Sequence, residues 1–587
     1  MKHYWIGGLM MAAISCGCKK DKLVDNTGLI KTATANGLTN ITTDKAFYKP
    51  GDQVNFTIDK ALPASVKIRY KQSGAVVQSA ALTGISWKWT APATDFTGYM
   101  IELFDGTDDQ EKIYGTIAVD VSSDPARFPR NAFLSAYGKL SDADIKTVMS
   151  SLNRYHMNYV QFQDWEDKHH KPLAGTVARP DASWKDIANR DNYGATVKGY
   201  IDAAHSYNMK TLHYNLAYGA LNDAAADGVA ESWYLFNDGS HTKKEVATLP
   251  QPLFKSDLYL MDPSNTGWQQ YIAAKTNEAF QVYPFDGYQI DQLGNRDKTL
   301  YNYNGGTVDL PTAFNSFIKA MKLAMPTKAL VMNAVTQYGQ PQIAAAPVDF
   351  LYSEVWAPNE AYKDLGNIIR SNDALTGGAK KSVLAAYMDY DLAGSPGYFN
   401  TPGVLFTDAV IFAHGGSHLE LGEHMLGKEY FPNSNLQMHA DLQSAMISYY
   451  DFLTAYENLL RDGGVLNNPA IAAGDSKTRL NNFPPVTGQV SVIGRDLGSK
   501  QVIHLINFAN ANSLDWRDRN GTQTAPVPVT NGRFNFTSAK AIKKIWVASP
   551  DIDGGASKIV TYTQSGSSVT FTLPMLKYWD MVVVEYQ

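Results

Sequence analysis

Short runs in which hydrophobic and polar residues alternate fill the chain after residue 40. They read VNFTID, SVKIRYK, AVVQSAAL, SWKWTAP, GYMIELFD and KIYGTIAVDV, with turns containing Gly, Pro, Asp or Ser between them. Alternation of period two indicates strands with one buried face, and evenly spaced short strands are typical of β-sandwiches. We therefore predict a β-sandwich over residues 41–123, which ends at the hinge-like segment SSDPARFPR.

From about residue 128 the pattern changes to one of helices interleaved with strands. Helical spacing runs through DADIKTVMSSLNRYHMN, capped by Ser141 or Asp142, and through residues near 195–207, 268–282, 312–325 and 363–372. The candidate strands are NYVQFQDW, KTLHYNLAYG, LYLMD, FDGYQID, ALVMNAV, DFLYSEVW, SVLAAYMDY and VIFAHGGSHLELG. Repeated βα units with eight strands predict a central (β/α)8 TIM barrel over residues 124–465, closed by a long helix at about 436–460. A doubly wound open sheet is the alternative, but no G-x-G-x-x-G turn follows the first strand.

Alternating strands return after about residue 484. The runs are QVSVIGRD, QVIHLINF, AKAIKKIWVAS, KIVTYTQ, SVTFTLP and WDMVVVEY. This pattern predicts a second all-β domain over residues 480–587, so the fold class is multidomain, with a barrel flanked by two β-sandwiches.

The N-terminus has the pattern of a bacterial lipoprotein signal. A basic residue precedes the apolar run 5–14, and small residues with Cys16 and Cys18 follow; these are the only cysteines of the chain. We predict a signal peptide over residues 1–18, a polar tether over 19–40, and a lipid on Cys18, or else on Cys16. The protein then sits in the cell envelope of a Gram-negative bacterium as an outer-membrane lipoprotein, periplasmic or surface-exposed, and touches the membrane only through this anchor. Plain secretion is the alternative.

Composition and charge narrow the range of partners. The 587 residues carry a net charge of −5, which disfavours a nucleic-acid partner because such a partner requires a basic face. Aromatic residues make up 12% of the chain, which suits β-rich cores and also suits stacking on sugar rings. We expect a monomer that does not bind nucleic acid.

Two of the predicted barrel strands deliver a carboxylate to their C-terminal ends. Asp291 ends the strand in FDGYQIDQLGNR, and Glu354 ends the strand in DFLYSEVW. Barrel enzymes place their active sites at these ends, and two carboxylates from different strands are the equipment for cleaving a glycosidic bond. Neighbouring amides suit an ionised Asp291 as nucleophile, whereas aromatic neighbours suit Glu354 as a protonated acid. A separation of about 5–6 Å between the two groups is predicted for a retaining enzyme, and about 9 Å would indicate inversion.

Further polar and aromatic residues at the predicted strand ends are candidate substrate contacts. We assign stacking to Trp165, Tyr218 and Trp356. We assign hydrogen bonding to sugar hydroxyls, or support of the catalytic groups, to Asp164, Tyr214, Asn215, Gln289, Gln292, Asn333, His418 and Glu420. The adjacent histidines 169 and 170 have no third ligand at convincing spacing, and His414 with His418 and Glu420 suits hydrogen bonding better than a metal. We predict no metal and no cofactor.

Several long segments resemble those of glycoside hydrolase family 66, which contains endo-dextranases and cycloisomaltooligosaccharide glucanotransferases. They are YVQFQDWEDKHHKPLAG, YNLAYGA, FDGYQIDQLG, NAVTQYG, DFLYSEVW and HGGSHLELGEHML…EYFPN. The resemblance implies Asp291 as nucleophile, Glu354 as acid/base, retention of anomeric configuration and an α-1,6-linked glucan as substrate. It also implies an immunoglobulin-like N-terminal domain and a Greek-key C-terminal domain.

The cyclising members of that family carry a carbohydrate-binding module inserted in the later half of the barrel, and the stretch between Glu354 and His418 is too short for one. We therefore expect an endo-dextranase whose partners are dextran and linear isomaltooligosaccharides. The alternatives are a cycloisomaltooligosaccharide glucanotransferase, separable by its cyclic products, and a non-catalytic surface glycan-binding lipoprotein.

Overall fold

The computed structural model of the protein describes residues 37–107 and 110–587. The predicted signal peptide, both candidate lipid-anchor cysteines and most of the predicted tether lie outside the described residues. Within the described ranges, the helices are all too short or too polar to span a lipid bilayer.

Two antiparallel sheets form the N-terminal part of the described chain. One sheet has the order β1-β2-β5 and the other the order β4-β3-β6-β7. Their strands are β1 (Ile41–Thr43), β2 (Gln53–Ile58), β3 (Lys67–Gln72), β4 (Ala75–Ala81), β5 (Ser86–Thr90), β6 (Thr97–Asp105) and β7 (Lys112–Val121). Both sheets contribute to one buried cluster that includes Phe56, Tyr70, Trp89 and Ile101. Each run that the alternation predicted as a strand in this region is a strand.

The central part contains two parallel sheets. The larger has the order β21-β18-β14-β9-β8 and the smaller the order β22-β23-β25. The strands are β8 (Asn131–Leu134), β9 (Tyr159–Phe162), β14 (Lys210–Leu216), β18 (Gly287–Asp291), β21 (Ala329–Met332), β22 (Leu351–Glu354), β23 (Ser382–Ala385) and β25 (Ser417–His418). Isolated parallel bridges join the two sheets at both edges, between Asn333 and Tyr352 and between Phe133 and Gly422.

Helices alternate with these strands along the chain. They are α1 (Asp142–Arg154), α2 (Gly194–Ser206), α3 (Thr266–Val282), α4 (Leu310–Ala324), α5 (Gln340–Ala344), α6 (Tyr362–Thr376) and α7 (Thr401–Ala413). The first begins at a capping box, in which the Ser141 hydroxyl accepts from the Asp144 backbone and the Asp144 carboxylate accepts from that of Ser141. The predicted long helix is split into α8 (Ala440–Ala455) and α9 (Glu457–Leu460).

Two predicted strands differ in the structure, and one parallel strand was not predicted. The run LYLMD forms β17 (Leu258–Leu260), which pairs antiparallel with β15 (Gly219–Ala220) and β16 (Val246–Ala247) outside the parallel sheets. The parallel strand that the sequence pattern did not predict is β8, because its four residues are too few to show a period. The start of the last predicted strand, VIFA, is the end of α7 instead. A helix buried on every side and a buried strand both read as unbroken apolar runs, so periodicity alone does not separate them.

Antiparallel sheets form the C-terminal part. The larger runs β27-β30-β31-β37-β33-β34 with β29 beside β30, and the smaller runs β28-β32-β36-β35. The strands of the larger are β27 (Val465–Asn467), β29 (Leu480–Asn482), β30 (Val490–Asp496), β31 (Lys500–Asn507), β33 (Ile542–Ala548), β34 (Lys558–Val560) and β37 (Trp579–Tyr586). Those of the smaller are β28 (Ile471–Ala473), β32 (Val529–Thr537), β35 (Tyr562–Ser565) and β36 (Ser568–Leu576).

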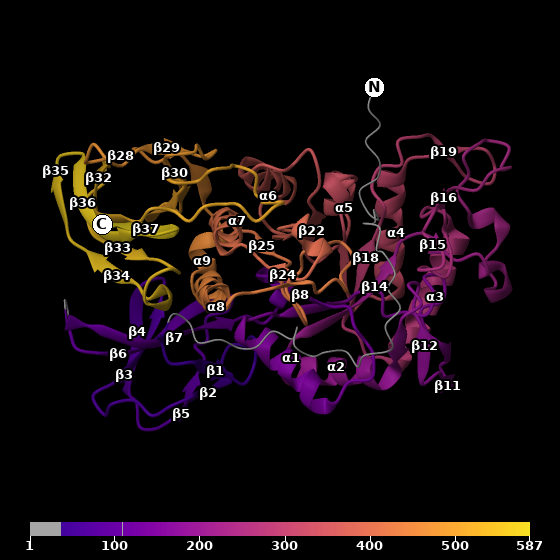
Figure 1. The fold of residues 1–587 in the computed structure, drawn as a ribbon, viewed down its shortest axis with the longest axis horizontal. Helices are drawn as coiled ribbons and strands as arrows, with labels where there is room; N and C mark the ends of the chain where they lie inside the picture. Colours follow the sequence, from indigo (N-terminus) through magenta and orange to yellow (C-terminus); the bar gives the residue numbers. More distant parts are fainter. Residues whose placement is uncertain (1–36, 108–109) are drawn as a thin grey trace.

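The two β-rich parts lie side by side at one end of the molecule, although they are far apart in sequence (Figure 1). The ammonium group of Lys71 donates to the carbonyl of Ser557 at 2.8 Å, and the Thr116 hydroxyl donates to the carbonyl of Gly554 at 3.0 Å. The two β-rich parts therefore contact each other directly.

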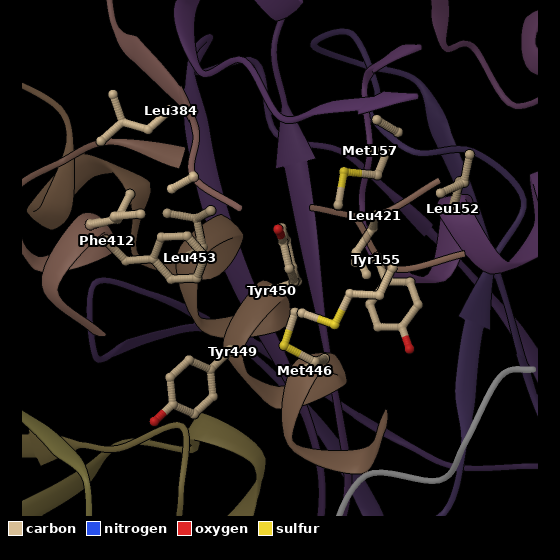
Figure 2. Close-up of a cluster of buried hydrophobic side chains, with 14 of the residues drawn as sticks. Leu152, Tyr155, Met157, Leu384, Phe412, Leu421, Met446, Tyr449, Tyr450 and Leu453 are labelled. Carbon is tan, nitrogen blue, oxygen red and sulfur yellow. The ribbon is translucent and has the colours of Figure 1, made fainter. Parts of the chain in front are cut away.

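Helix α8 lies where the three parts meet. Its side chains Met446, Tyr449, Tyr450 and Leu453 point in several directions within one apolar cluster (Figure 2). The ring of Tyr450 packs on that of Tyr155, and Tyr449 packs on Trp579 of the C-terminal sheet.

A buried ion pair on α8 joins this helix to α1 and to β7. Asp451 accepts two hydrogen bonds of 2.9 Å from the guanidinium of Arg154, one from His156 at 2.7 Å, and one from the backbone of Ala118 at 3.1 Å. Both charged side chains are fully or almost fully buried. Removing one partner of such a pair leaves an uncompensated charge in the core.

We predict that Arg154→Met lowers the free energy of unfolding by about 3–5 kcal/mol, because Asp451 loses its bidentate partner inside the protein. Denaturant unfolding measures the loss. Lys198→Met is the control, since Lys198 and Asp202 form an exposed pair on α2, and it should change stability by less than about 1 kcal/mol. Equal stabilities of the two variants would contradict the role assigned to Asp451.

Candidate active site

A cavity of about 400 Å³ opens at the C-terminal ends of the parallel strands. Its lining comes from residues in or just after six parallel strands, namely β9, β14, β18, β21, β22 and β23. The loops near residues 249–258 and 428–435 also contribute. The polar part of the lining includes Gln161, Gln163, Asp164, His169, Tyr214, Gln289, Asp291, Gln292, Asn333, Tyr352, Glu354 and Tyr387. Both carboxylates predicted to be catalytic therefore face one space.

Asp291 is the last residue of β18, and three donors hold its carboxylate. The Tyr214 hydroxyl donates to Oδ2 at 2.8 Å. The side-chain amide of Asn333 donates to Oδ1 at 2.9 Å, and the backbone amide of Gln292 donates to the same atom at 2.8 Å. Hydrogen bonds of this kind favour the ionised form of a carboxyl group.

Glu354 is the last residue of β22, and its carboxylate has fewer donors. The Tyr387 hydroxyl donates to Oε1 at 2.8 Å, and the Asn333 amide donates to Oε2 at 3.1 Å. In return, the backbone N–H of Glu354 donates to the Asn333 side-chain oxygen at 3.1 Å. The Asn333 amide is thus oriented by the strand that carries Glu354.

A single nitrogen, Nδ2 of Asn333, lies within hydrogen-bond distance of both carboxylates. Because it lies 2.9 Å from Oδ1 of Asp291 and 3.1 Å from Oε2 of Glu354, these two oxygens are at most 6.0 Å apart. Two negative charges this close in a buried site do not both form readily.

Burial raises the pKa of both carboxyl groups, and their hydrogen-bond donors differ. Burial, and next the nearby charge of Asp291, raise the pKa of Glu354 to about 7, against the hydrogen bonds from Tyr387 and Asn333. Burial also raises the pKa of Asp291, and hydrogen bonds from Tyr214, Asn333 and Gln292 oppose the rise. When only one of the two carboxyl groups is ionised, we assign the proton to Glu354, because Asp291 has more hydrogen-bond donors to its charged form.

Five of the other predicted substrate contacts line the cavity: Asp164, Tyr214, Gln289, Gln292 and Asn333. Tyr214 and Asn333 contact the carboxylates, as described above. The Gln292 side chain instead spans the turn after β18, since it donates to the carbonyl of Asn333 and accepts from the backbone of Gly294. The side-chain oxygen of Gln289 is buried without a protein partner and faces this cavity, where a sugar hydroxyl could donate to it.

Asp164 lines the cavity from a backbone with a φ of 49°, a value that is rare for a residue with a side chain. Burial, and next the charge of Glu166, raise the pKa of Asp164 to about 7. Asp164 thus lies in the cavity as a carboxyl group that can donate as well as accept a hydrogen bond near neutral pH.

Six predicted contacts lie outside the cavity lining: Trp165, Tyr218, Asn215, Trp356, His418 and Glu420. Trp165 is fully buried between Trp184 and Tyr283, and its indole donates to His213 at 2.8 Å, so its faces are not open to a sugar. Tyr218 is also buried, and its hydroxyl accepts from the backbone of Leu293 in the turn after Asp291.

Asn215 is the third of these. It lies beneath the cavity and holds the loop of His169, to whose ring and carbonyl its side chain hydrogen-bonds at 2.9 and 2.7 Å. Trp356 is the fourth, and it packs on Tyr387 and Tyr390 behind Glu354. Trp165 and Tyr218 are buried and offer no open ring face in this structure, whereas Trp356 is half-buried and its predicted stacking role stays a prediction.

His418 and Glu420 are also buried away from the cavity, together with Asp408. The Nδ1 atom of His418 lies 2.9 Å from Asp408 and 3.2 Å from Glu420, and Nε2 lies 2.8 Å from the carbonyl of Ala386. Although burial lowers the pKa of His418, the charges of Glu420 and Asp408 raise it well above its usual value. Neither His418 nor Glu420 lines the cavity in this structure, so their contact with a substrate stays a prediction.

Two groups of described residues have ligand atoms close enough to hold a metal ion. One is the set of Asp408, His418 and Glu420. The other is His170 with Asp223 and Asp227, where Lys168 and Lys171 already donate to the Asp227 carboxylate at 2.8 and 3.0 Å. Basic side chains therefore supply the positive charge in the second group.

Sequence reasoning missed Tyr387, whose hydroxyl donates to Glu354. Tyr387 follows β23 with the same parity as the buried Val383 and Ala385, so the alternation could have identified it. It also missed Tyr430 and Phe431, which line the cavity from a loop after the last parallel strand and carry no periodic signal.

Comparisons with known proteins agree with this geometry. Residues 43–583 match the family described as glycosyl hydrolase family 66. A cycloisomaltooligosaccharide glucanotransferase of Niallia circulans is 27% identical over 717 aligned positions, covering 94% of this chain and 72% of the relative. A dextranase of Streptococcus salivarius is 25% identical over 537 positions, covering 80% and 63%.

A solved structure is similar over nearly the whole chain. It is the crystal structure of a Paenibacillus sp. cycloisomaltooligosaccharide glucanotransferase complexed with cycloisomaltoheptaose. The TM-score is 0.83 at 25% identity, with 94% of this chain and 100% of that chain covered. Because the family match extends over far more than half of its residues, the chain belongs to glycosyl hydrolase family 66.

Proposed function

We propose that the protein is a retaining endo-glycosidase that cleaves α-1,6-glucosidic bonds in dextran and releases linear isomaltooligosaccharides. The observation that carries the proposal is the amide of Asn333, which contacts both Asp291 and Glu354 and so limits their oxygens to a separation of 6.0 Å. Retaining glycosidases have carboxyl groups about 5–5.5 Å apart, whereas inverting ones need about 6.5–9.5 Å to admit a water.

The site supplies the two carboxyl states that double displacement requires. Asp291, ionised, attacks C1 of a glucosyl unit, and the C1–O6 bond breaks as Glu354 gives its proton to the departing O6. The same Glu354, now ionised, takes a proton from water, which attacks C1 and releases Asp291. Tyr214 and Gln292 hold the nucleophile in position, and Tyr387 holds the acid/base.

We infer that the eight parallel strands close into a (β/α)8 barrel. The support is that bridges join the five-stranded and three-stranded sheets at both edges and that helices separate most of the successive strands. Such a barrel brings the C-terminal ends of its strands to one face, which accounts for residues from six strands meeting at one cavity.

Hydrolysis is preferred to cyclisation because a glucanotransferase relative has many positions, within the aligned region, that this chain lacks. The alignment with the N. circulans glucanotransferase is 717 positions long, whereas this chain has 587 residues in all. That relative therefore contains at least 130 aligned positions without a counterpart here. A glucanotransferase remains the alternative, because three of the similar proteins carry that name and because a sugar hydroxyl can replace water in the second step. A purely glycan-binding role needs no pair of carboxyl groups and is disfavoured.

We also propose several features of the chain from its sequence pattern. They are a signal peptide over residues 1–18, a tether over 19–40, a lipid on Cys18 or Cys16, and an envelope location. They also include a monomeric state and the division into an immunoglobulin-like part (41–123), a barrel (124–465) and a Greek-key part (480–587).

We predict that Asp291→Asn lowers dextran cleavage by on the order of 10⁴-fold or more, because the nucleophile is lost. Chromatography of the products and NMR of the new anomeric centre measure the result, with linear α-configured oligosaccharides expected from the wild type. Asp202→Asn on the exposed face of α2 is the control and should leave the rate unchanged. Cyclic products would move the assignment to a glucanotransferase, and a β-configured product would overturn retention.

We also predict that kcat/KM for dextran falls as the pH rises through about 7, because Glu354 must be protonated to act as the acid. The hydrogen bond from Tyr387 lowers the pKa of Glu354, so Tyr387→Phe should move this alkaline limb to higher pH. The control is Tyr390→Phe, since the Tyr390 hydroxyl donates to Glu429 at 2.8 Å and not to Glu354. A limb that moves to lower pH in Tyr387→Phe would contradict the assignment.

A further inference from the structure

We propose that Arg517, on the loop between β31 and β32 of the C-terminal part, is a positioning residue for the acid/base Glu354. The inference rests on the proposed function, because it assigns to Glu354 the proton transfer described above. It extends that function to a loop that is remote from the parallel strands in sequence.

The guanidinium of Arg517 is fully buried and donates to two backbone carbonyls beside Glu354. Nη2 donates to the carbonyl of Val355, the residue after Glu354, at 2.8 Å. Nη1 donates to the carbonyl of Tyr387 at 3.1 Å, and the Tyr387 hydroxyl donates to Glu354. One planar side chain therefore fixes the backbone that carries the acid and the backbone that carries its hydrogen-bond donor.

Aromatic rings fix the plane of this guanidinium. Its central carbon lies 4.6 Å from the ring centre of Trp516, 4.9 Å from that of Trp356 and 5.5 Å from that of Tyr390. Cation–π contacts of this kind are favourable in a desolvated site. They also explain why Trp356 packs behind Glu354, although it comes two residues after the acid in sequence.

The rest of the loop is attached to the ends of the parallel strands on both sides of Arg517. The indole of Trp516 donates to the carbonyl of Asn359 at 2.7 Å, and the carbonyl of Arg517 accepts from the backbone of Asp389 at 2.9 Å. Asn400 donates to Asp518 at 2.7 Å. These contacts anchor the loop independently of the guanidinium, so replacing that group should leave the loop in place.

Charge on the guanidinium is balanced away from the cavity. Glu360 lies 3.5 Å from Nε of Arg517 and also pairs with Arg519. Arg517 itself does not line the cavity and reaches Glu354 only through two carbonyls. Its role is therefore to hold geometry, and the expected defect lies in proton delivery and not in substrate binding.

The test compares two substrates that differ in their need for an acid. The departing O6 of dextran requires protonation, whereas fluoride leaves from α-isomaltosyl fluoride with little help from an acid. For Arg517→Met we expect kcat/KM to fall on the order of 100-fold on dextran and less than about 3-fold on the fluoride. We expect Arg517→Lys to lose less on dextran, since an ammonium can restore one hydrogen bond but not the planar fork.

Arg495→Met is the matched control. Arg495 is also a buried arginine of the C-terminal sheets, and it donates to the carbonyls of Gly463 at 2.9 Å and His414 at 3.2 Å, neither of which adjoins a catalytic carboxylate. Its variant should change both substrates equally, whatever it does to the melting temperature. If Arg517→Met does not fold, Arg517→Lys carries the same comparison.

The outcomes separate the inference from the proposed function. A selective loss on dextran in the Arg517 variants supports the positioning role. Suppose that the wild type is active and that the Arg517 variants lose activity on both substrates equally, or on neither. That result overturns this inference alone. A wild type that cleaves neither substrate overturns the proposed function, and the inference with it.

Discussion

The chemistry of this protein depends on one shared hydrogen-bond donor, the side-chain amide of Asn333. Its nitrogen lies between Asp291 and Glu354, and its oxygen accepts from the backbone of Glu354. A neutral donor between two acids brings them close without adding charge. The separation stays short, and the repulsion between two charges at that distance favours a proton on one of the two carboxyl groups.

The remainder of the site gives the two acids different surroundings. Asp291 accepts from Tyr214 and from the backbone of Gln292 in addition to Asn333. Glu354 lies deeper among aromatic rings, with the Tyr387 hydroxyl as its second donor. Because a charged carboxylate is favoured by more donors and disfavoured by burial, the different surroundings of the two carboxyl groups assign the proton to Glu354.

Local sequence pattern predicted much of the secondary structure and both acids, because alternation reports which face of a strand is buried. It failed where the chain changes direction. Gln161 and Gln163 line the cavity, and Trp165 would follow them on the same face if the strand continued. The positive φ of Asp164 interrupts that alternation, and the indole of Trp165 lies in the core instead. Short or fully buried elements such as β8 and α7 also escaped, since four residues show no period and an unbroken apolar run fits either element.

Periodicity along the sequence does not report contacts between distant segments. Those contacts join the parts of the chain. The apolar cluster around α8 includes Phe47 of the N-terminal part, Tyr450 of α8 and Trp579 of the C-terminal sheet. Asp451 connects α8 to α1 and to β7, and Arg517 connects the C-terminal sheets to the ends of β22 and β23. The flanking β-rich parts are therefore more than supports for the central strands. One of them supplies the guanidinium that donates to the backbone of Val355, just after Glu354, and to that of Tyr387, so the geometry around Glu354 depends on the assembled chain.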